Sequence, residues 1–129
     1  MTIRILVIDD HPMVRAGVRA ELEKSGADLE VVGEAEDGSR AVEVATRLRP
    51  DVVLMDMQMP VMDGLEATRR IRATTLAGPQ PIIIAMTANA FKEDVDRALD
   101  AGMNAHLSKP VNVEEMKLVL GKYLQGANR

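Results

Sequence analysis

Residues 51–60, DVVLMDMQMP, contain a buried-strand pattern that stops at a carboxylate. The four apolar residues 52–55 have the length of a buried strand, and Pro60 and Gly64 prevent its continuation. Asp56 is therefore expected at the carboxyl end of a strand. In an open α/β sheet ligands bind at this edge, because the loops there leave the sheet in opposite directions. Asp56 is a candidate nucleophile or metal ligand, and the alternative is a loop carboxylate that caps the next helix.

Strand and helix patterns alternate on both sides of this stretch. The expected strands are residues 3–8, 30–36, 52–55, 82–86 and 105–107, and the expected helices run from Pro12 to a stop at Gly26, from Gly38 until Pro50 ends it, from Gly64 to 71 or 72, over 92–101 and over 113–124. Five nearly all-apolar strands alternating with five helices predict an α/β fold, a single doubly wound five-stranded parallel sheet with helices on both faces, flavodoxin-like. The helix over 92–101 is expected to turn Val95, Ala98 and Leu99 inward, and residues 74–81 are expected to form a flexible connection.

Length and composition fit a single globular domain. The 129 residues are 47% hydrophobic and 28% charged, which is ordinary for a soluble domain and leaves no room for a second one. We assign residues 1–124 to the domain and 125–129 to a tail or the start of a linker. The sequence has no cysteine, and it begins with a strand-like run rather than a signal peptide. Disulfide and thiolate chemistry are therefore excluded, and a cytoplasmic location is expected.

The charge balance narrows the class of partner. The formal net charge is −4, whereas nucleic-acid binding depends on clustered Lys and Arg that release counterions. We therefore expect no direct nucleic-acid binding by this chain, and its composition is not that of a membrane protein. The expected partners are a cation and other proteins.

Polar side chains follow four of the five expected strands at their carboxyl ends. These side chains are Asp9 and Asp10 after the first strand, Asp56 after the third, Thr87 after the fourth and Lys109 after the fifth. Carboxylates at one point repel each other, by about 4 kcal/mol per pair at about 4 Å and an effective dielectric constant of about 20. A divalent cation relieves this repulsion, and oxygen ligands favour Mg²⁺ or Mn²⁺.

Such a group of residues suits phosphoryl transfer to a carboxylate. Asp56 would attack, the cation and Lys109 would neutralise the phosphoryl oxygens, and the Thr87 hydroxyl would donate a hydrogen bond to one of them. Each residue also has a simpler interpretation. A Thr after a strand is commonly a cap, a Lys is commonly solvated, and adjacent Asp residues commonly begin a helix. Their shared place at one sheet edge favours the functional interpretation.

Four segments resemble those of the receiver domains of two-component response regulators, and the resemblance runs nearly end to end. The segments are LVIDD at 6–10, LMDMQMPVMDG at 54–64, MTA at 86–88 and SKP at 108–110. The resemblance implies a set of roles for individual residues. Asp56 is the implied phosphoacceptor, Asp9 and Asp10 the acid pair for Mg²⁺, the Gln58 backbone carbonyl a further ligand, Thr87 the switch hydroxyl and Lys109 the phosphate-pairing lysine. The Lys109-Pro110 bond is often cis in such proteins.

The sequence departs from the family pattern at the second switch residue. Three residues before Lys109 the family usually has Tyr or Phe, whereas this chain has His106. One hypothesis is a switch that responds to pH between about 5 and 8, where imidazole titrates. The alternative is a partly buried neutral histidine. The subfamily is also open: residues 11–17 resemble receivers that precede a DNA-binding helix-turn-helix, and residues 86–90 resemble receivers attached to hybrid sensor kinases.

The resemblance implies a phosphoacceptor signalling switch that takes a phosphoryl group from a histidine kinase or a histidine phosphotransfer protein. The phosphorylated chain would then act on a downstream protein or a fused output domain, and it would promote only its own phosphorylation and dephosphorylation. An Asp-nucleophile phosphatase of the haloacid dehalogenase type is a rival, but such enzymes have a second Asp where this chain has Gln58. A binding module that works without phosphorylation is the other alternative.

Overall fold

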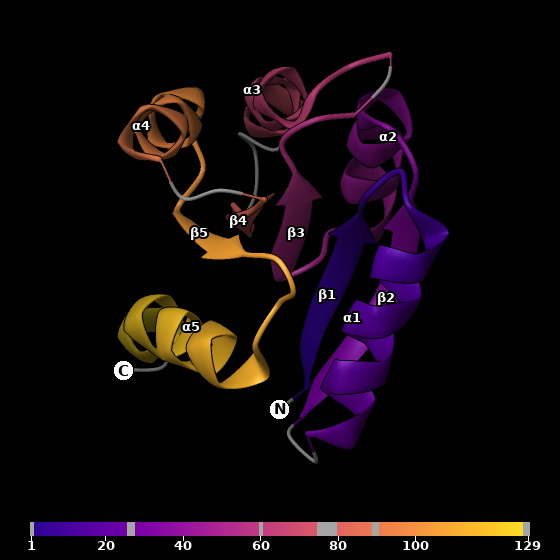
Figure 1. The fold of residues 1–129 in the computed structure, drawn as a ribbon, viewed down its shortest axis with the longest axis vertical. Coiled ribbons are helices and arrows are strands. Elements are labelled where there is room, and N and C mark those ends of the chain that lie inside the picture. The colour runs from indigo at the N-terminus through magenta and orange to yellow at the C-terminus, as the bar shows by residue number, and fades with distance from the viewer. Residues whose placement is uncertain (1, 26–27, 60, 75–79, 89–90, 128–129) are drawn as a thin grey trace.

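The computed structural model describes residues 2–25, 28–59, 61–74, 80–88 and 91–127. Strands and helices alternate strictly along the chain (Figure 1). The strands are β1 (Ile3–Ile8), β2 (Leu29–Ala35), β3 (Val52–Asp56), β4 (Ile82–Thr87) and β5 (Ala105–Ser108). The helices are α1 (Pro12–Lys24), α2 (Gly38–Leu48), α3 (Gly64–Thr74), α4 (Lys92–Ala101) and α5 (Val113–Ala127). No helix within these ranges is both long and apolar enough to cross a membrane.

The strands form one parallel sheet in the order β2-β1-β3-β4-β5. Alternate residues of each central strand point to opposite faces, so Leu6 and Ile8 of β1 pack with α2, α3 and α4, whereas Ile5 and Val7 pack with α1 and α5. Figure 1 shows these two groups of helices on the two sides of the sheet. The prediction of a doubly wound five-stranded parallel sheet is confirmed.

The strand order places β1 and β3 side by side at the centre of the sheet, with Ile8 opposite Met55. The chain leaves β1 toward β2 and leaves β3 toward β4, so the loops that follow these strands diverge. A crevice opens at such a reversal point, at the carboxyl ends of the strands. Asp9 and Asp56 lie at this edge because each stands where its buried strand ends.

Most element boundaries agree with those expected, and two details differ. Leu99 was expected to face inward, but 48% of its surface is exposed, whereas Ala98 and Ala101 of α4 are buried. The helix therefore packs through a narrow stripe of small side chains, which apolar spacing alone does not indicate. Helix α5 continues to Ala127, beyond the expected end at Leu124, and both Gly121 and Gly126 lie within it.

Some expected features fall outside the described residues. These are the helix stop at Gly26, most of the connection expected over 74–81, and the last two residues of the expected tail. Of the described part of that connection, Thr74 ends α3 and residues 80–81 directly precede β4.

Candidate functional site

Three carboxylates converge at the carboxyl edge of β1 and β3. Asp9 and Asp10 follow β1, and Asp56 is the last residue of β3. One ligand atom from each of these residues and one from His11 all lie within 4.8 Å of one another. Asp9 is fully buried and Asp56 is 6% exposed, so the negative charges are concentrated where water screens them least.

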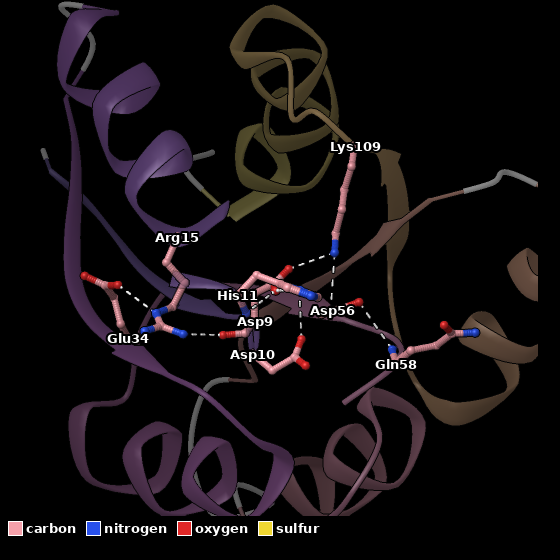
Figure 2. Close-up of polar contacts among 8 residues, drawn as sticks. All are labelled: Asp9, Asp10, His11, Arg15, Glu34, Asp56, Gln58 and Lys109. Carbon is pink, nitrogen blue, oxygen red and sulfur yellow. Dashed lines mark hydrogen bonds and ion pairs between the residues drawn. The ribbon is translucent and has the colours of Figure 1, made fainter. Parts of the chain in front are cut away.

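Lys109 connects the two buried carboxylates. Its Nζ lies 2.8 Å from Asp9 Oδ2 and 3.4 Å from Asp56 Oδ2 (Figure 2). The backbone N–H of Lys109 donates to the Thr87 carbonyl oxygen at 2.8 Å, which fixes the lysine beside the end of β4. The Lys109-Pro110 peptide bond is cis. One ammonium group therefore pairs with two carboxylates, and the site retains a net negative charge.

The pKa directions of these groups follow from their burial and contacts. Burial, together with the negative charge of Asp9, raises the pKa of Asp56 above its ordinary value. Burial also acts to raise the pKa of Asp9, but hydrogen bonds from Lys109 and from His11 outweigh it and lower that pKa. Burial acts to lower the pKa of Lys109, but Asp9 and Asp56 raise it. The Asp9–Lys109 pair is therefore ionised, whereas the ionised form of Asp56 is disfavoured.

The loop after β3 holds Asp56 from its own backbone. The N–H of Gln58 donates to Asp56 Oδ1 at 3.2 Å, and the N–H of Gly64 donates to the Met57 carbonyl at 3.1 Å. A Cβ at position 64 would overlap the carbonyl oxygen of Asp56 and lie 2.9 Å from the Met57 Cα. Gly64 is therefore required because the backbone at the start of α3 lies directly against the backbone of Asp56 and Met57.

Replacement of Gly64 tests this close approach. Gly64→Ala is expected to lower the free energy of unfolding by about 1–3 kcal/mol, because the atoms in its way are backbone atoms that cannot turn aside. Gly17→Ala is the matched control, since it lies inside α1 with no atom within 4 Å of the added Cβ. That control should raise stability by about 0.5–1 kcal/mol. Urea unfolding of both variants checks the prediction, and equal effects at the two positions would contradict it.

A cavity of about 550 Å³ opens over Asp56. Its lining includes the predicted site residues Gln58, Thr87 and Lys109, together with His11. Thr87 is 5% exposed, and its Oγ1 has no hydrogen-bond partner within the part of the chain that the structure describes. A buried hydroxyl without a partner is costly, so Thr87 has an unused donor available to a group bound in this cavity.

Sequence reasoning missed three residues near the acid pair: His11 and Arg15 contact it directly, and Arg19 pairs with Glu34 beside it. Arg15 donates from Nη1 to the Asp9 carbonyl oxygen at 2.6 Å and from Nε to Glu34 Oε1 at 3.0 Å (Figure 2). Arg19 also pairs with Glu34, at 2.6 Å from Nη2 to Oε2, and both arginines lower the Glu34 pKa. His11 contacts Asp9 and Asp10. Arg15 and Arg19 are four residues apart on one side of α1, and His11 is the N-cap residue of that helix, so the fourfold spacing was a usable signal.

His106 lies apart from these groups. It is a partly buried residue of β5 and is opposite Ala85 in the sheet register. It does not line the cavity over Asp56. Its role as the second switch residue remains a prediction.

The side chains at this edge fit a divalent cation. Asp9, Asp10 and Asp56 supply carboxylate oxygens, the ligands that Mg²⁺ prefers, and their mutual spacing leaves each within reach of a common ion. The single ammonium group of Lys109 does not balance three carboxylates. These residues therefore suit a metal ion and, beside it, an anionic group that Lys109 and Thr87 contact.

Known proteins resemble the chain over nearly its whole length. The sequence matches the family of response regulator receiver domains over residues 5–120. It is 38% identical over 126 residues to the response regulator protein VraR of Staphylococcus aureus, an alignment that covers 98% of this chain and 58% of that protein. The chain therefore spans less than two thirds of this relative.

Two solved structures bear on the site. The receiver domain of sensor histidine kinase PA1611 from Pseudomonas aeruginosa, with a magnesium ion coordinated in its active site cleft, is 37% identical with a TM-score of 0.79, over 97% of this chain and 99% of that one. The receiver domain of the Saccharomyces cerevisiae response regulator Ssk1, crystallised with the histidine phosphotransfer protein Ypd1, is 28% identical with a TM-score of 0.78, over 90% and 84% of the two chains.

Proposed function

Because the chain belongs to the family of response regulator receiver domains, we propose that Asp56 is its phosphoacceptor and that Asp9, Asp10 and Lys109 are the groups that make the transfer possible. A receiver domain is a regulatory signalling domain. The observation that carries the proposal is the position of Lys109, whose ammonium group reaches both Asp9 and Asp56 beside the open cavity.

The proposed reaction moves a phosphoryl group from a phosphohistidine to Asp56. A carboxylate oxygen of Asp56 forms the new P–O bond while the P–N bond of the donor breaks, and the donor ring, already protonated on its other nitrogen, leaves as neutral imidazole. Lys109 neutralises one phosphoryl oxygen, and the Thr87 hydroxyl donates to another. Asp9, Asp10, Asp56 and the Gln58 carbonyl would hold the divalent cation, which supplies further positive charge to the phosphoryl oxygens when bound.

The response proposed for the rest of the domain follows from the charge added at Asp56. A phosphoryl group brings a charge of about −1.5 to −2, which attracts the Thr87 hydroxyl and Lys109 at the ends of β4 and β5. We propose that this shifts an existing equilibrium of the surface formed by α4, β5 and α5. His106 of β5 is the proposed second switch residue. Amide shifts in α5 should therefore change on phosphorylation.

The proposal also covers partners and place of action. The donor is a histidine kinase or a histidine phosphotransfer protein, and the recipient of the signal is a downstream protein or a fused output domain rather than nucleic acid. Mn²⁺ is proposed to substitute for Mg²⁺, and the domain promotes only its own phosphorylation and dephosphorylation. We propose the cytoplasm as the place of action.

Intact mass after incubation with acetyl phosphate tests the proposed function. One phosphoryl group should be added with Mg²⁺ present and none with EDTA. Borohydride reduces an aspartyl phosphate to homoserine, so peptide masses after reduction should place the modification at Asp56. If no phosphoryl group is added under either condition, the chain is instead a receiver-like binding module that works without phosphorylation.

The support that Arg15 gives to Asp9 leads to a separate prediction. Arg15→Lys keeps the charge, but the lysine cannot bond the Asp9 carbonyl and Glu34 together as the planar guanidinium does. Mg²⁺ affinity should fall by about tenfold, the usual cost of losing a group that orients a ligand. Arg19→Lys is the control, because Arg19 bonds Glu34 without contacting Asp9. Mg²⁺ titration followed by amide shifts measures both, and equal affinities would contradict a positioning role.

A further inference from the structure

We propose that His11 is a nitrogen ligand of the metal site, and that it gives this receiver domain a preference for Mn²⁺ and other first-row transition cations over Mg²⁺. This inference rests on the proposed function only for the location of the metal. It concerns a residue that the family resemblance does not include among the ligands.

The imidazole lies where a ligand of the same ion would lie. His11 Nδ1 is 3.1 Å from Asp9 Oδ1 and 3.0 Å from Asp10 Oδ1, and Figure 2 shows the ring directed toward both carboxylates. Neighbouring ligands of an octahedral ion with bonds of about 2.1 Å are about 3.0 Å apart. The spacing between the nitrogen and the two oxygens therefore equals the edge of such an octahedron.

The backbone holds His11 in this place independently of its ring. The His11 N–H donates to Asp9 Oδ1 at 2.9 Å, and Pro12 fixes the start of α1 directly after it. His11 is the N-cap residue of α1, but its side chain makes no capping hydrogen bond. The ring is thus directed at the acid pair rather than at the helix, and it lines the cavity over Asp56.

An imidazole ligand changes which cation the site favours. Mg²⁺ prefers oxygen ligands only, whereas imidazole suits the first-row transition metals, whose affinity for mixed nitrogen and oxygen sites rises from Mn²⁺ toward Cu²⁺. Three carboxylates alone accept either class. The addition of His11 therefore strengthens the binding of Mn²⁺ more than that of Mg²⁺.

A simpler interpretation of the same contacts predicts the opposite result. If His11 only forms an ion pair with Asp9 and Asp10, an incoming cation must displace it, and its removal should strengthen the binding of both cations by the same factor. A ligand role requires its removal to weaken the binding of Mn²⁺ in particular. The sign of the effect on Mn²⁺ affinity therefore separates the two interpretations.

The test uses Mn²⁺ itself as the probe, in the wild type, His11→Asn and His106→Asn. The sequence has two histidines, so His106→Asn removes the other imidazole as a matched control. Pulsed EPR of bound Mn²⁺ should detect a nitrogen hyperfine coupling in the wild type and in His106→Asn, and ¹⁵N-histidine labelling should change that coupling. His11→Asn should lose it, and its Mn²⁺ affinity should fall by about tenfold or more, with a smaller change for Mg²⁺.

Two outcomes would overturn the inference: a wild-type spectrum without histidine nitrogen coupling, or equal changes of Mn²⁺ and Mg²⁺ affinity in His11→Asn. The labelled wild-type spectrum needs no variant, so it stands even if His11→Asn folds poorly. None of these measurements uses a phosphoryl donor. A failure of the proposed function therefore appears as absent phosphorylation of the wild type, whereas a failure of this inference appears in metal binding alone.

Discussion

Asp56→Asn is expected to take up no phosphoryl group from acetyl phosphate or from a phosphohistidine donor, at any Mg²⁺ concentration. The amide is not a nucleophile under these conditions, and no nearby acid replaces Asp56. Asp9 is bound by Lys109 and His11. Asp10 pairs with His11 and, among the described residues, not with Lys109. Intact mass under the conditions used for the wild type measures the result.

Asp51→Asn is the matched control for this loss. Asp51 stands at the opposite end of the same strand, where its Oδ2 accepts a hydrogen bond from the Arg4 N–H at 2.9 Å, and an asparagine keeps an acceptor oxygen there. This variant should be phosphorylated like the wild type. Persistent uptake by Asp56→Asn would mean that another residue is the acceptor.

Asp56→Asn should also make the domain more stable at neutral pH in the absence of metal. Burial and the charge of Asp9 raise the pKa of Asp56 in the folded protein. Because its folded-state pKa is raised, Asp56 stabilises the folded protein at pH values below its ordinary pKa of about 3.9. This contribution is lost as the pH rises through the folded-state pKa. Asparagine does not titrate, so Asp56→Asn should raise the free energy of unfolding at pH 7 and leave it unchanged at acid pH. Thermal unfolding at both pH values measures this.

The sequence was sufficient to predict the groups that stand at strand ends. Asp9, Asp56 and Thr87 each end or follow a buried apolar run, and a parallel sheet brings the carboxyl ends of such runs to one edge. Their convergence therefore follows from local pattern and fold class together. The contact of Lys109 with both carboxylates required the structure, because spacing along the chain does not specify where a long side chain ends.

Contacts between side chains and distant backbone were not predictable in this way. Arg15 bonds the carbonyl of Asp9 and the side chain of Glu34, and any residue type at position 9 would offer the same carbonyl. The prediction of the buried face of α4 was wrong at Leu99 for a related reason. Apolar spacing included Leu99, but the contact surface of that helix is the narrow stripe at Ala98 and Ala101, and its width depends on the neighbouring elements.

Arg72 makes several contacts of this kind at once. From the last turn of α3 it donates from Nε to the Gly102 carbonyl at 2.9 Å, from Nη1 to the Pro81 carbonyl at 2.6 Å and from Nη2 to Asn104 Oδ1 at 2.7 Å. Asn104 in turn bonds β4 through the Ile83 N–H. One half-buried guanidinium thus joins α3, the start of β4 and the turn into β5.

Arg72→Met is expected to lower the free energy of unfolding by about 2–4 kcal/mol. Methionine keeps much of the side-chain volume but leaves two carbonyl oxygens and the amide oxygens of Gln80 and Asn104 without their charged donor. Hydrogen bonds to charged groups contribute about 1.5–3 kcal/mol each. Water reaches part of this half-buried site, so the expected loss is smaller than the sum of these contributions. Urea unfolding measures the loss. Hydrogen exchange should show it most strongly at Ile83 and Asn104, whose N–H groups lie within this network.

Arg69→Met is the control that isolates this network from the general loss of a positive charge on α3. Arg69 is exposed and pairs only with Glu66 among the described residues, at 3.6 Å, and such a surface pair contributes about 0–1 kcal/mol. Because β5 leads directly into Lys109, a loosened Arg72 network should also disturb the contact of that lysine with Asp9 and Asp56, and Arg72→Met should lose part of its phosphorylation rate. Equal stability of the two variants would show that water replaces the guanidinium without cost, and that β5 is positioned by its strand pairing with β4 alone.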